Sequence, residues 1–184
     1  MRLFAHLAAG LGLILALAAP ALAQAITPAQ HDALAARIES FDVAMRASDM
    51  TGIMGVVPPK VLDEIARQNN ITSEQLIAAA QQQIDAAMAN ITLVSFGMEL
   101  DKAEYKTLPD GSSYALIPTE TVMDLGSAGG GKFRATSSTL GLLDGETWYL
   151  VRVEDPQQVA ILKTVYPAFA DVVFPTGSME PVTP

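Results

Sequence analysis

The stretch TLVSFGMELD, residues 92–101, is where the hydrophobic pattern of the chain changes its period. Within it, apolar side chains alternate with polar or small ones. The apolar positions are Val94, Phe96, Met98 and Leu100, and the positions between them are Ser95, Gly97, Glu99 and Asp101. Alternation of this kind is typical of a strand that buries one face. Helical spacing precedes this stretch and more alternation follows it, so the chain is expected to form helices first and a sheet afterwards.

Upstream, a long amphipathic helix is predicted over residues 28–47. Thr27 can cap its first turn, Pro28 suits the first helical position, and Gln30 can bond back to the cap. Apolar residues then recur every three or four positions, at Leu34, Ile38, Phe41 and Met45. This spacing places them on one side of the helix, which we expect to face the core.

Two further helices are predicted before the strand. The glycines and the Pro58-Pro59 pair within residues 52–59 end the first pattern, and a short helix opened by proline follows. Thr72 and Gln75 repeat the capping arrangement ahead of a third helix, predicted over residues 73–90.

Three more strands are predicted after the first one, over residues 112–124, 132–143 and 146–154. Pro109-Asp110-Gly111 and Asp144-Gly145 are turn sequences, and Asp-Gly is a strong signal for a tight hairpin. A glycine-rich loop spans residues 126–131. The strands are therefore expected to form an antiparallel meander.

These elements predict one α+β domain over residues 24–174. Three N-terminal helices are expected to pack on one face of a curved antiparallel sheet of about four strands. Asp155-Pro156 opens a short C-terminal helix that ends near Val165, and residues 175–184 are interpreted as a flexible tail.

Residues 1–23 have the features of a cleavable secretory signal peptide. Arg2 gives a positively charged start, an apolar run extends from Leu7 to Ala19, and Ala21-Leu22-Ala23 forms a small-x-small cleavage site. The apolar run is shorter than the roughly 20 residues that cross a bilayer, so no stable membrane anchor is expected. We therefore expect an exported protein, located in a periplasm or outside the cell.

Composition excludes several classes of function. The formal net charge is −9, and loss of Arg2 with the signal peptide would make it −10, so no nucleic-acid partner is expected. The chain has no cysteine, and His31 is the only histidine after residue 23, which excludes metal sites built from thiolates or several imidazoles. The glycine-rich loop leads into a strand, unlike a phosphate-binding loop, which opens a helix. No metal ion and no other cofactor is expected.

The order of elements resembles the nuclear-transport-factor-2-like superfamily, whose cone-shaped domain curls an antiparallel sheet around a long first helix. The resemblance rests on three stretches: residues 44–49 (AMRASD) at the end of the first helix, the Pro58-Pro59 break, and residues 146–151 (ETWYLV) in the last strand. It covers nearly all of the chain after residue 23. It implies a curled sheet with an apolar interior, and some members of the superfamily are isomerases, dehydratases or cyclases.

Tyr114, Glu120 and Asp124 are the candidate catalytic residues. They have the same parity along one predicted strand and would point to one face if no bulge intervenes. In an apolar pocket a carboxyl group has a raised pKa and can act as an acid or a base. The alternative is that Glu120 and Asp124 simply meet solvent near the end of the strand.

Phe41, Met45, Phe96 and Trp148 are the candidate pocket residues, because a curled sheet leaves an apolar cavity if the first helix does not fill it. Trp148 and Tyr149 point to opposite sides of a strand that is apolar on both faces, so another segment or a second copy should cover the second face. The favoured hypothesis is a non-catalytic domain that binds a small apolar ligand or a protein partner, and a second copy in a homodimer is one such partner. The alternative is a cofactor-free acid–base lyase or isomerase.

Overall fold

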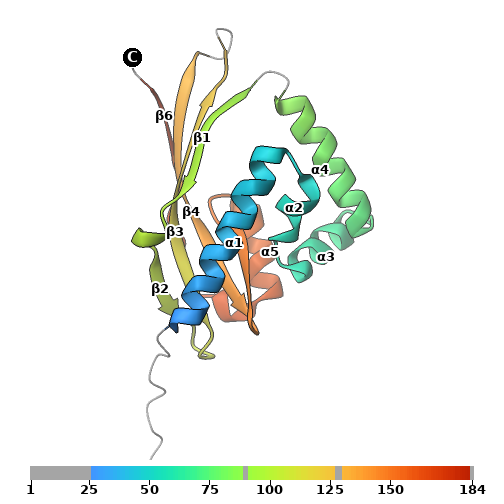
Figure 1. The fold of residues 1–184 in the computed structure, drawn as a ribbon. Coiled ribbons are helices and arrows are strands. Elements are labelled where there is room, and N and C mark those ends of the chain that lie inside the picture. The colour runs from blue at the N-terminus through green and yellow to red at the C-terminus, as the bar shows by residue number, and fades with distance from the viewer. Residues whose placement is uncertain (1–25, 89–90, 127–129, 183–184) are drawn as a thin grey trace, which may run out of the picture.

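The computed structural model describes residues 26–88, 91–126 and 130–182, and it shows an α+β domain with a curled antiparallel sheet (Figure 1). The helices are α1 (Pro28–Ala47), α2 (Met50–Gly55), α3 (Pro59–Gln68), α4 (Ser73–Met88) and α5 (Pro156–Val165). The strands are β1 (Thr92–Met98), β2 (Glu104–Thr107), β3 (Ser113–Asp124), β4 (Lys132–Asp144), β5 (Thr147–Arg152) and β6 (Ser178–Pro181). Two short 3-10 helices are η1 (Leu100–Lys102) and η3 (Pro167–Phe169). The signal peptide predicted over residues 1–23 lies outside the described residues.

Helix α1 has the bounds and the capping expected from the sequence. The Thr27 hydroxyl accepts a hydrogen bond from the Gln30 backbone N–H at 3.2 Å, and the Gln30 side chain accepts one from the Thr27 backbone N–H at 2.9 Å. These bonds satisfy N–H groups that have no partner inside the helix. The helix ends where Ser48 adopts a left-handed conformation, with φ of 52°.

The N-terminal region forms four helices in the described residues, whereas three were expected. The additional helix is α2, which contains Gly52 and Gly55. A Cβ atom on Gly52 would lie 2.8 Å from the Ala44 Cβ of α1, so the absence of a side chain lets the two helices approach closely. The sequence predicts that these glycines interrupt the helical pattern, whereas in the structure Gly52 lies within α2 and allows it to pack on α1.

The sheet has six strands, and its central order is β1-β3-β4-β5. Two short strands were not predicted: β2 pairs with β3, and β6 pairs with β4. Because β5 pairs with β4 only from Thr139 onward, the earlier part of β4 is free to pair with β6. The segment expected to be a flexible tail therefore contributes a strand.

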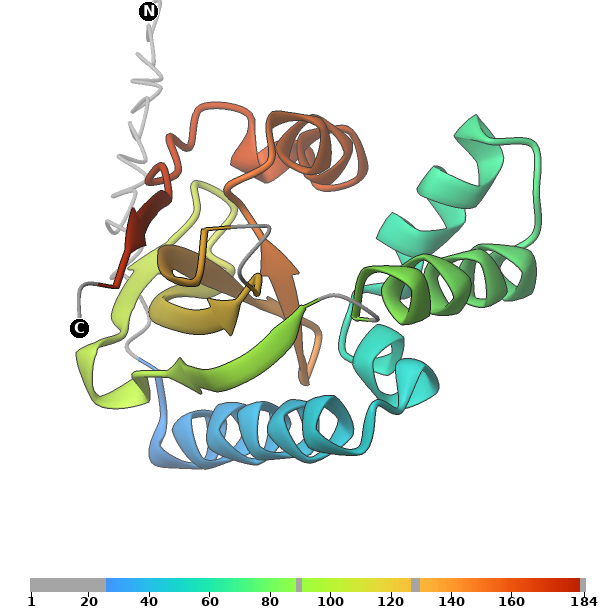
Figure 2. The same cartoon turned by 90° about the horizontal axis from the view of Figure 1, so that it is seen from above.

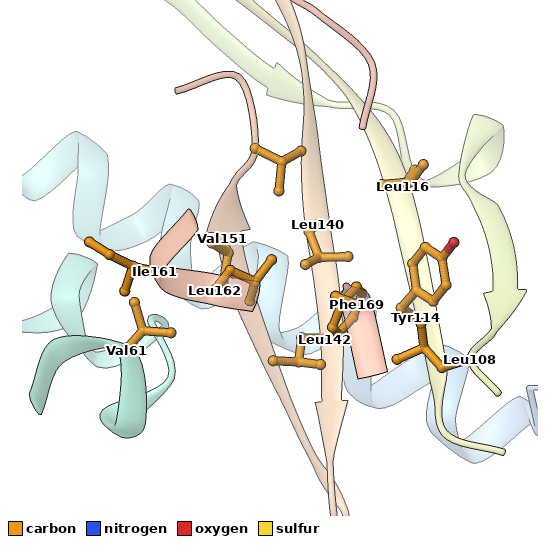
Figure 3. Packing of buried hydrophobic residues seen from close by; sticks show 11 residues of the cluster. Val61, Leu108, Tyr114, Leu116, Leu140, Leu142, Val151, Ile161, Leu162 and Phe169 are labelled. Atoms are coloured by element: carbon orange, nitrogen blue, oxygen red, sulfur yellow. The ribbon is translucent and has the colours of Figure 1, made fainter. Parts of the chain in front are cut away.

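Helices lie on both faces of the sheet, which corrects the expectation of one covered face (Figure 2). Side chains of α1 pack on the face that carries Ala115 and Ile117. The opposite face carries Tyr114 and Leu116 and packs against α3, α5 and η3 (Figure 3). Helix α4 packs on α2 and α3 instead of on the sheet.

The second apolar face of β5 is covered by the chain itself. Trp148 and Leu150 belong to the core under α1, whereas Val151 belongs to the core under α5 with Ile161 and Leu162. Of the two ways to cover this face that the sequence left open, another segment of the same chain is the one observed. This strand therefore supplies no argument for a homodimer.

A polar cluster joins α3, the β4–β5 turn and the end of α5. The Asp144 carboxylate accepts hydrogen bonds from Lys60 Nζ at 2.8 Å and from the Tyr166 hydroxyl at 2.9 Å. The bond from Lys60, followed by that from Tyr166, holds the pKa of Asp144 below its usual range. Burial, reinforced by the bond to Asp144, raises the pKa of Tyr166.

These shifts predict that the folded protein loses stability at both ends of the pH scale. A carboxyl group with a lowered folded pKa stabilises the fold above its unfolded pKa, about 4, and this contribution is lost as the pH falls through the folded value. A tyrosine with a raised folded pKa stabilises the fold below its unfolded pKa, about 10, and this contribution is lost at higher pH. Urea denaturation across a pH series should show a weaker acid decline for Asp144→Asn and a weaker alkaline decline for Tyr166→Phe. Unchanged declines in both variants would contradict this assignment.

Candidate functional site

A cleft lies between the C-terminal half of α1 and strand β1. Its volume is about 520 Å³, which is within the usual range of roughly 300–1,000 Å³ for small-molecule sites. The lining residues are Asp42, Met45, Arg46 and Ser48 at the end of α1, and Ile91, Thr92, Leu93, Val94, Ser95 and Phe96 in and before β1. The cleft thus combines an apolar surface with hydroxyl and charged groups at its margins.

The apolar stripe of α1 extends from the core into the cleft. Leu34 is fully buried, and Phe41 packs against the same core. The rings of Phe41 and Phe96 meet edge to face, with centroids 5.5 Å apart. Met45 lies one helical turn beyond Phe41 on the same side and is only half buried. The stripe therefore leaves the core at its C-terminal end and forms a wall of the cleft.

Strand β1 contains a β-bulge beside the cleft. Leu93 pairs with Met123 and Ser95 pairs with Val122, so Val94 is the extra residue in the register. Val94 is 49% exposed. A bulge of this kind redirects a side chain and increases the local twist of the strand. It also breaks the strict alternation that the sequence predicted for this strand.

The two charged residues of the cleft neutralise each other. Arg46 Nε donates to Asp42 Oδ2 at 2.8 Å, one helical turn apart. This hydrogen bond and the charge of Asp42 raise the pKa of Arg46. Both side chains remain substantially exposed, so the pair contributes little to stability. The cleft consequently offers a site without net charge.

Three of the four candidate pocket residues gather at this cleft. Met45 and Phe96 line it, and Phe41 supports Phe96 from the core side. Trp148 does not line it, because β5 is separated from β1 by β3 and β4. Its indole is 2% exposed, and Nε1 donates to the Gln30 carbonyl at 2.8 Å, near the opposite end of α1.

The three candidate catalytic residues share a face of β3 but do not form one site. The pairing of β3 with β4 has no register shift, so their side chains point the same way. Tyr114 is buried in the core with its ring centroid 5.3 Å from that of Phe169. Glu120 is exposed and pairs with Arg134 at 3.1 Å, while Asp124 accepts a bond from the Gly126 N–H. The buried ring of Tyr114 is therefore separated from the exposed, paired carboxylate of Glu120.

Several cleft residues were not selected from the sequence. Leu93 was not selected because the alternating pattern placed it on the opposite side of β1 from Phe96, and the bulge brings it to the cleft. Asp42 and Arg46 carry a recognisable signal, since oppositely charged residues four positions apart on a helix are neighbours. Asp42 and Arg46 flank the apolar stripe of α1 near Met45, so they lie at its solvent-exposed border.

Comparison of the chain with protein-family models, curated proteins and solved structures gives no match. The resemblance to the nuclear-transport-factor-2-like superfamily therefore stays a prediction, carried by the residues quoted for it. Within the described ranges, no helix is both long and apolar enough to span a bilayer. In the same residues, no three histidine, aspartate or glutamate side chains gather into a group that could hold a metal ion.

Proposed function

We propose that this protein is an exported, non-catalytic binding domain whose cleft between α1 and β1 holds the apolar part of a ligand. The observation that carries the proposal is the cleft itself: Met45, Leu93 and Phe96 present apolar surface in a hollow of ligand size. Sites for small molecules usually combine such a surface with a few polar groups that orient the ligand. Thr92, Ser95 and the Asp42–Arg46 pair are suitably placed for that role.

Binding is favoured over catalysis because neither Asp42 in the cleft nor Glu120 among the candidate catalytic residues has the setting that acid–base chemistry needs. A catalytic carboxyl group is usually shielded from water. Asp42 is instead paired with Arg46 at the surface, and the carboxylate of Glu120 is paired with Arg134 on β4. The lyase or isomerase alternative therefore has no observation in its favour.

Export and the superfamily assignment belong to the same proposal. The signal-like residues 1–23 support a periplasmic or extracellular location. The order of helices before a curled antiparallel sheet supports a likeness to the nuclear-transport-factor-2-like superfamily. Under this proposal the partner is an apolar small molecule or a protein segment, and neither nucleic acid nor a cofactor is involved.

Binding of the neutral apolar dye N-phenyl-1-naphthylamine tests the proposal. We expect saturable fluorescence enhancement with the intact protein. The Met45→Asp variant should bind the dye about tenfold more weakly, because it places a charge where the bound dye buries its apolar surface. The matched control is Val43→Asp, since Val43 is 61% exposed and does not line the cleft. Thermal unfolding of both variants would confirm that each is folded. Equal dye affinity in the two variants would show that the cleft is not the binding site.

A further inference from the structure

Strand β1 is an edge of the sheet with little protection against further strand pairing. In the part of the chain that is described, β1 pairs with β3 alone. The seven residues Thr92–Met98 include no charged residue and no proline. Edge strands in natural proteins are usually blocked by such residues, by a bulge, or by a covering segment. Among the residues that the structure describes, the bulge at Val94 is the one such protection that β1 has.

The other described edges are protected. β2 carries Glu104 and Lys106, and β6 has four residues and ends in Pro181. The outer side of β5 is occupied by the segment before α3, since the Leu150 N–H donates to the Val56 carbonyl at 2.7 Å. Of the strand edges that the structure describes, the edge of β1 is therefore the one left open to a further strand.

Backbone groups of β1 point outward along this edge. The Glu99 N–H donates to the Pro118 carbonyl of β3 at 2.9 Å. In an antiparallel pair, successive residues alternate between bonding to the neighbouring strand and pointing away from it. The N–H and C=O groups of Met98 and Phe96 therefore point away from β3, where an additional strand would meet them.

The cleft follows the same edge. It is lined by six consecutive residues, 91–96. Successive strand residues point to opposite faces, so a hollow that touches all six runs along the edge instead of over one face. Six strand residues span about 20 Å, so the hollow is long enough for an extended peptide of about six residues. Met45 and Arg46 of α1 form the opposite wall.

We infer that the cleft binds an extended, uncharged peptide segment, which adds to β1 as a further strand between β1 and the end of α1. This inference rests on the proposed function, because the same cleft holds the occupant. Strand addition to an open sheet edge is a general mode of peptide recognition. Main-chain hydrogen bonds provide the affinity, and alternate side chains provide the specificity.

The charges of the cleft determine the composition of the segment. Asp42 and Arg46 neutralise each other, and β1 has no charged side chain. A charged residue entering the cleft would lose water without gaining an opposite charge, which is unfavourable. Alternate apolar side chains of the segment would face Met45 and Phe96, and the residues between them would face water. The site is complementary to a neutral segment that alternates apolar and hydroxyl side chains.

A second copy of the chain is the other possible occupant of this edge. Helix α1 flanks β1 on the cleft side, so a second domain would have to bring its own α1 into the same space. A single extended chain has no such obstacle. Light scattering over a range of concentrations should therefore show a monomer. A dimer that is lost in Val94→Lys would overturn the inference of a peptide partner.

Peptides with blocked backbone N–H groups test strand addition directly. The probe is acetyl-Thr-Val-Thr-Val-Thr-Val-amide, with two variants N-methylated at the odd or at the even residues. In an extended peptide the amides of odd and even residues point to opposite sides, so only one of the two sets can bond to β1. The variant methylated on that set should bind at least about tenfold more weakly than the other variant, because its hydrogen bonds to β1 are lost. In the complex, hydrogen exchange of the Phe96 and Met98 amides should be slower. Equal binding by the two variants would overturn the inference.

Two exposed valines provide matched protein variants. Val94→Lys places a charge on the edge and should weaken binding of the unmodified peptide by about tenfold. Val43→Lys adds the same charge away from the cleft and should leave binding unchanged. If the naphthylamine dye binds the cleft but the peptide does not, the inference fails and the proposed function stands. If neither binds, both fail.

Discussion

Replacement of Trp148 by alanine should lower the free energy of unfolding by about 3–5 kcal/mol, the range found for removing large aromatic side chains from cores. Trp148 is 2% exposed and packs in the core that joins α1 to the sheet, with Leu34 and Ile117. Its loss would leave a cavity beneath α1 and would also remove the bond to the Gln30 carbonyl. Trp148 is the only tryptophan in the chain, so its replacement removes the tryptophan fluorescence signal. Urea denaturation is therefore followed by far-UV circular dichroism.

Two further variants separate packing from hydrogen bonding. Trp148→Phe keeps much of the ring but removes the indole N–H, so the loss attributable to the hydrogen bond should be about 1 kcal/mol. Tyr105→Ala removes an aromatic ring that is 37% exposed on β2 and should have a much smaller effect than Trp148→Ala. Similar losses for Tyr105→Ala and Trp148→Ala would contradict the placement of Trp148 in the core.

The elements that were predictable from sequence are those whose signals are local. Thr27, Pro28 and Gln30 specify the start of α1 without help from the rest of the chain, and the observed capping bonds are the expected ones. The Asp144-Gly145 sequence likewise predicts a tight turn between β4 and β5, although the turn lies one residue later than expected. Asp144 still pairs with Thr147, so the loop residues are Gly145 and Glu146, and Gly145 has a φ of 65° that glycine adopts without strain. The helices-then-sheet order follows from such signals.

The elements that were missed depend on distant neighbours. β6 has no alternating apolar pattern, and it forms because β4 extends beyond β5 and offers an unpaired edge. α2 has six residues, too few for a stable isolated helix, and it is held by close packing of Gly52 on α1. No pattern confined to either segment could have revealed these partners.

The candidate site was predictable only in part, for a similar reason. Helical spacing correctly placed Phe41 and Met45 on one side of α1, and parity placed Phe96 toward them. Parity shows which face a strand residue occupies but not how far it lies from another strand. Trp148 was therefore grouped with these residues, although it lies three strands away from β1 in the sheet.

Replacement of Gly141 by valine should lower the free energy of unfolding by about 1–3 kcal/mol, the usual effect of overpacking a core. Gly141 is buried in β4 where α1 crosses the sheet. A Cβ atom there would lie 3.3 Å from Leu34 Cδ1 and 3.5 Å from Ala115 Cβ, and the valine methyl groups would reach further into the same space. Urea denaturation measures the loss, and the naphthylamine dye shows whether displacement of α1 also changes the cleft.

Gly97→Val is the matched control, because a Cβ atom on Gly97 of β1 has no neighbour within 4 Å. Neither glycine has a positive φ, so steric strain of the backbone affects neither substitution. Valine is favoured over glycine in strands, and at an open position this preference should make the control neutral or slightly stabilising. The difference between the two variants therefore reports the space between α1 and the sheet. Equal stability of Gly141→Val and Gly97→Val would mean that α1 does not pack closely on β4, and the cleft at the end of α1 would then lose its supporting wall.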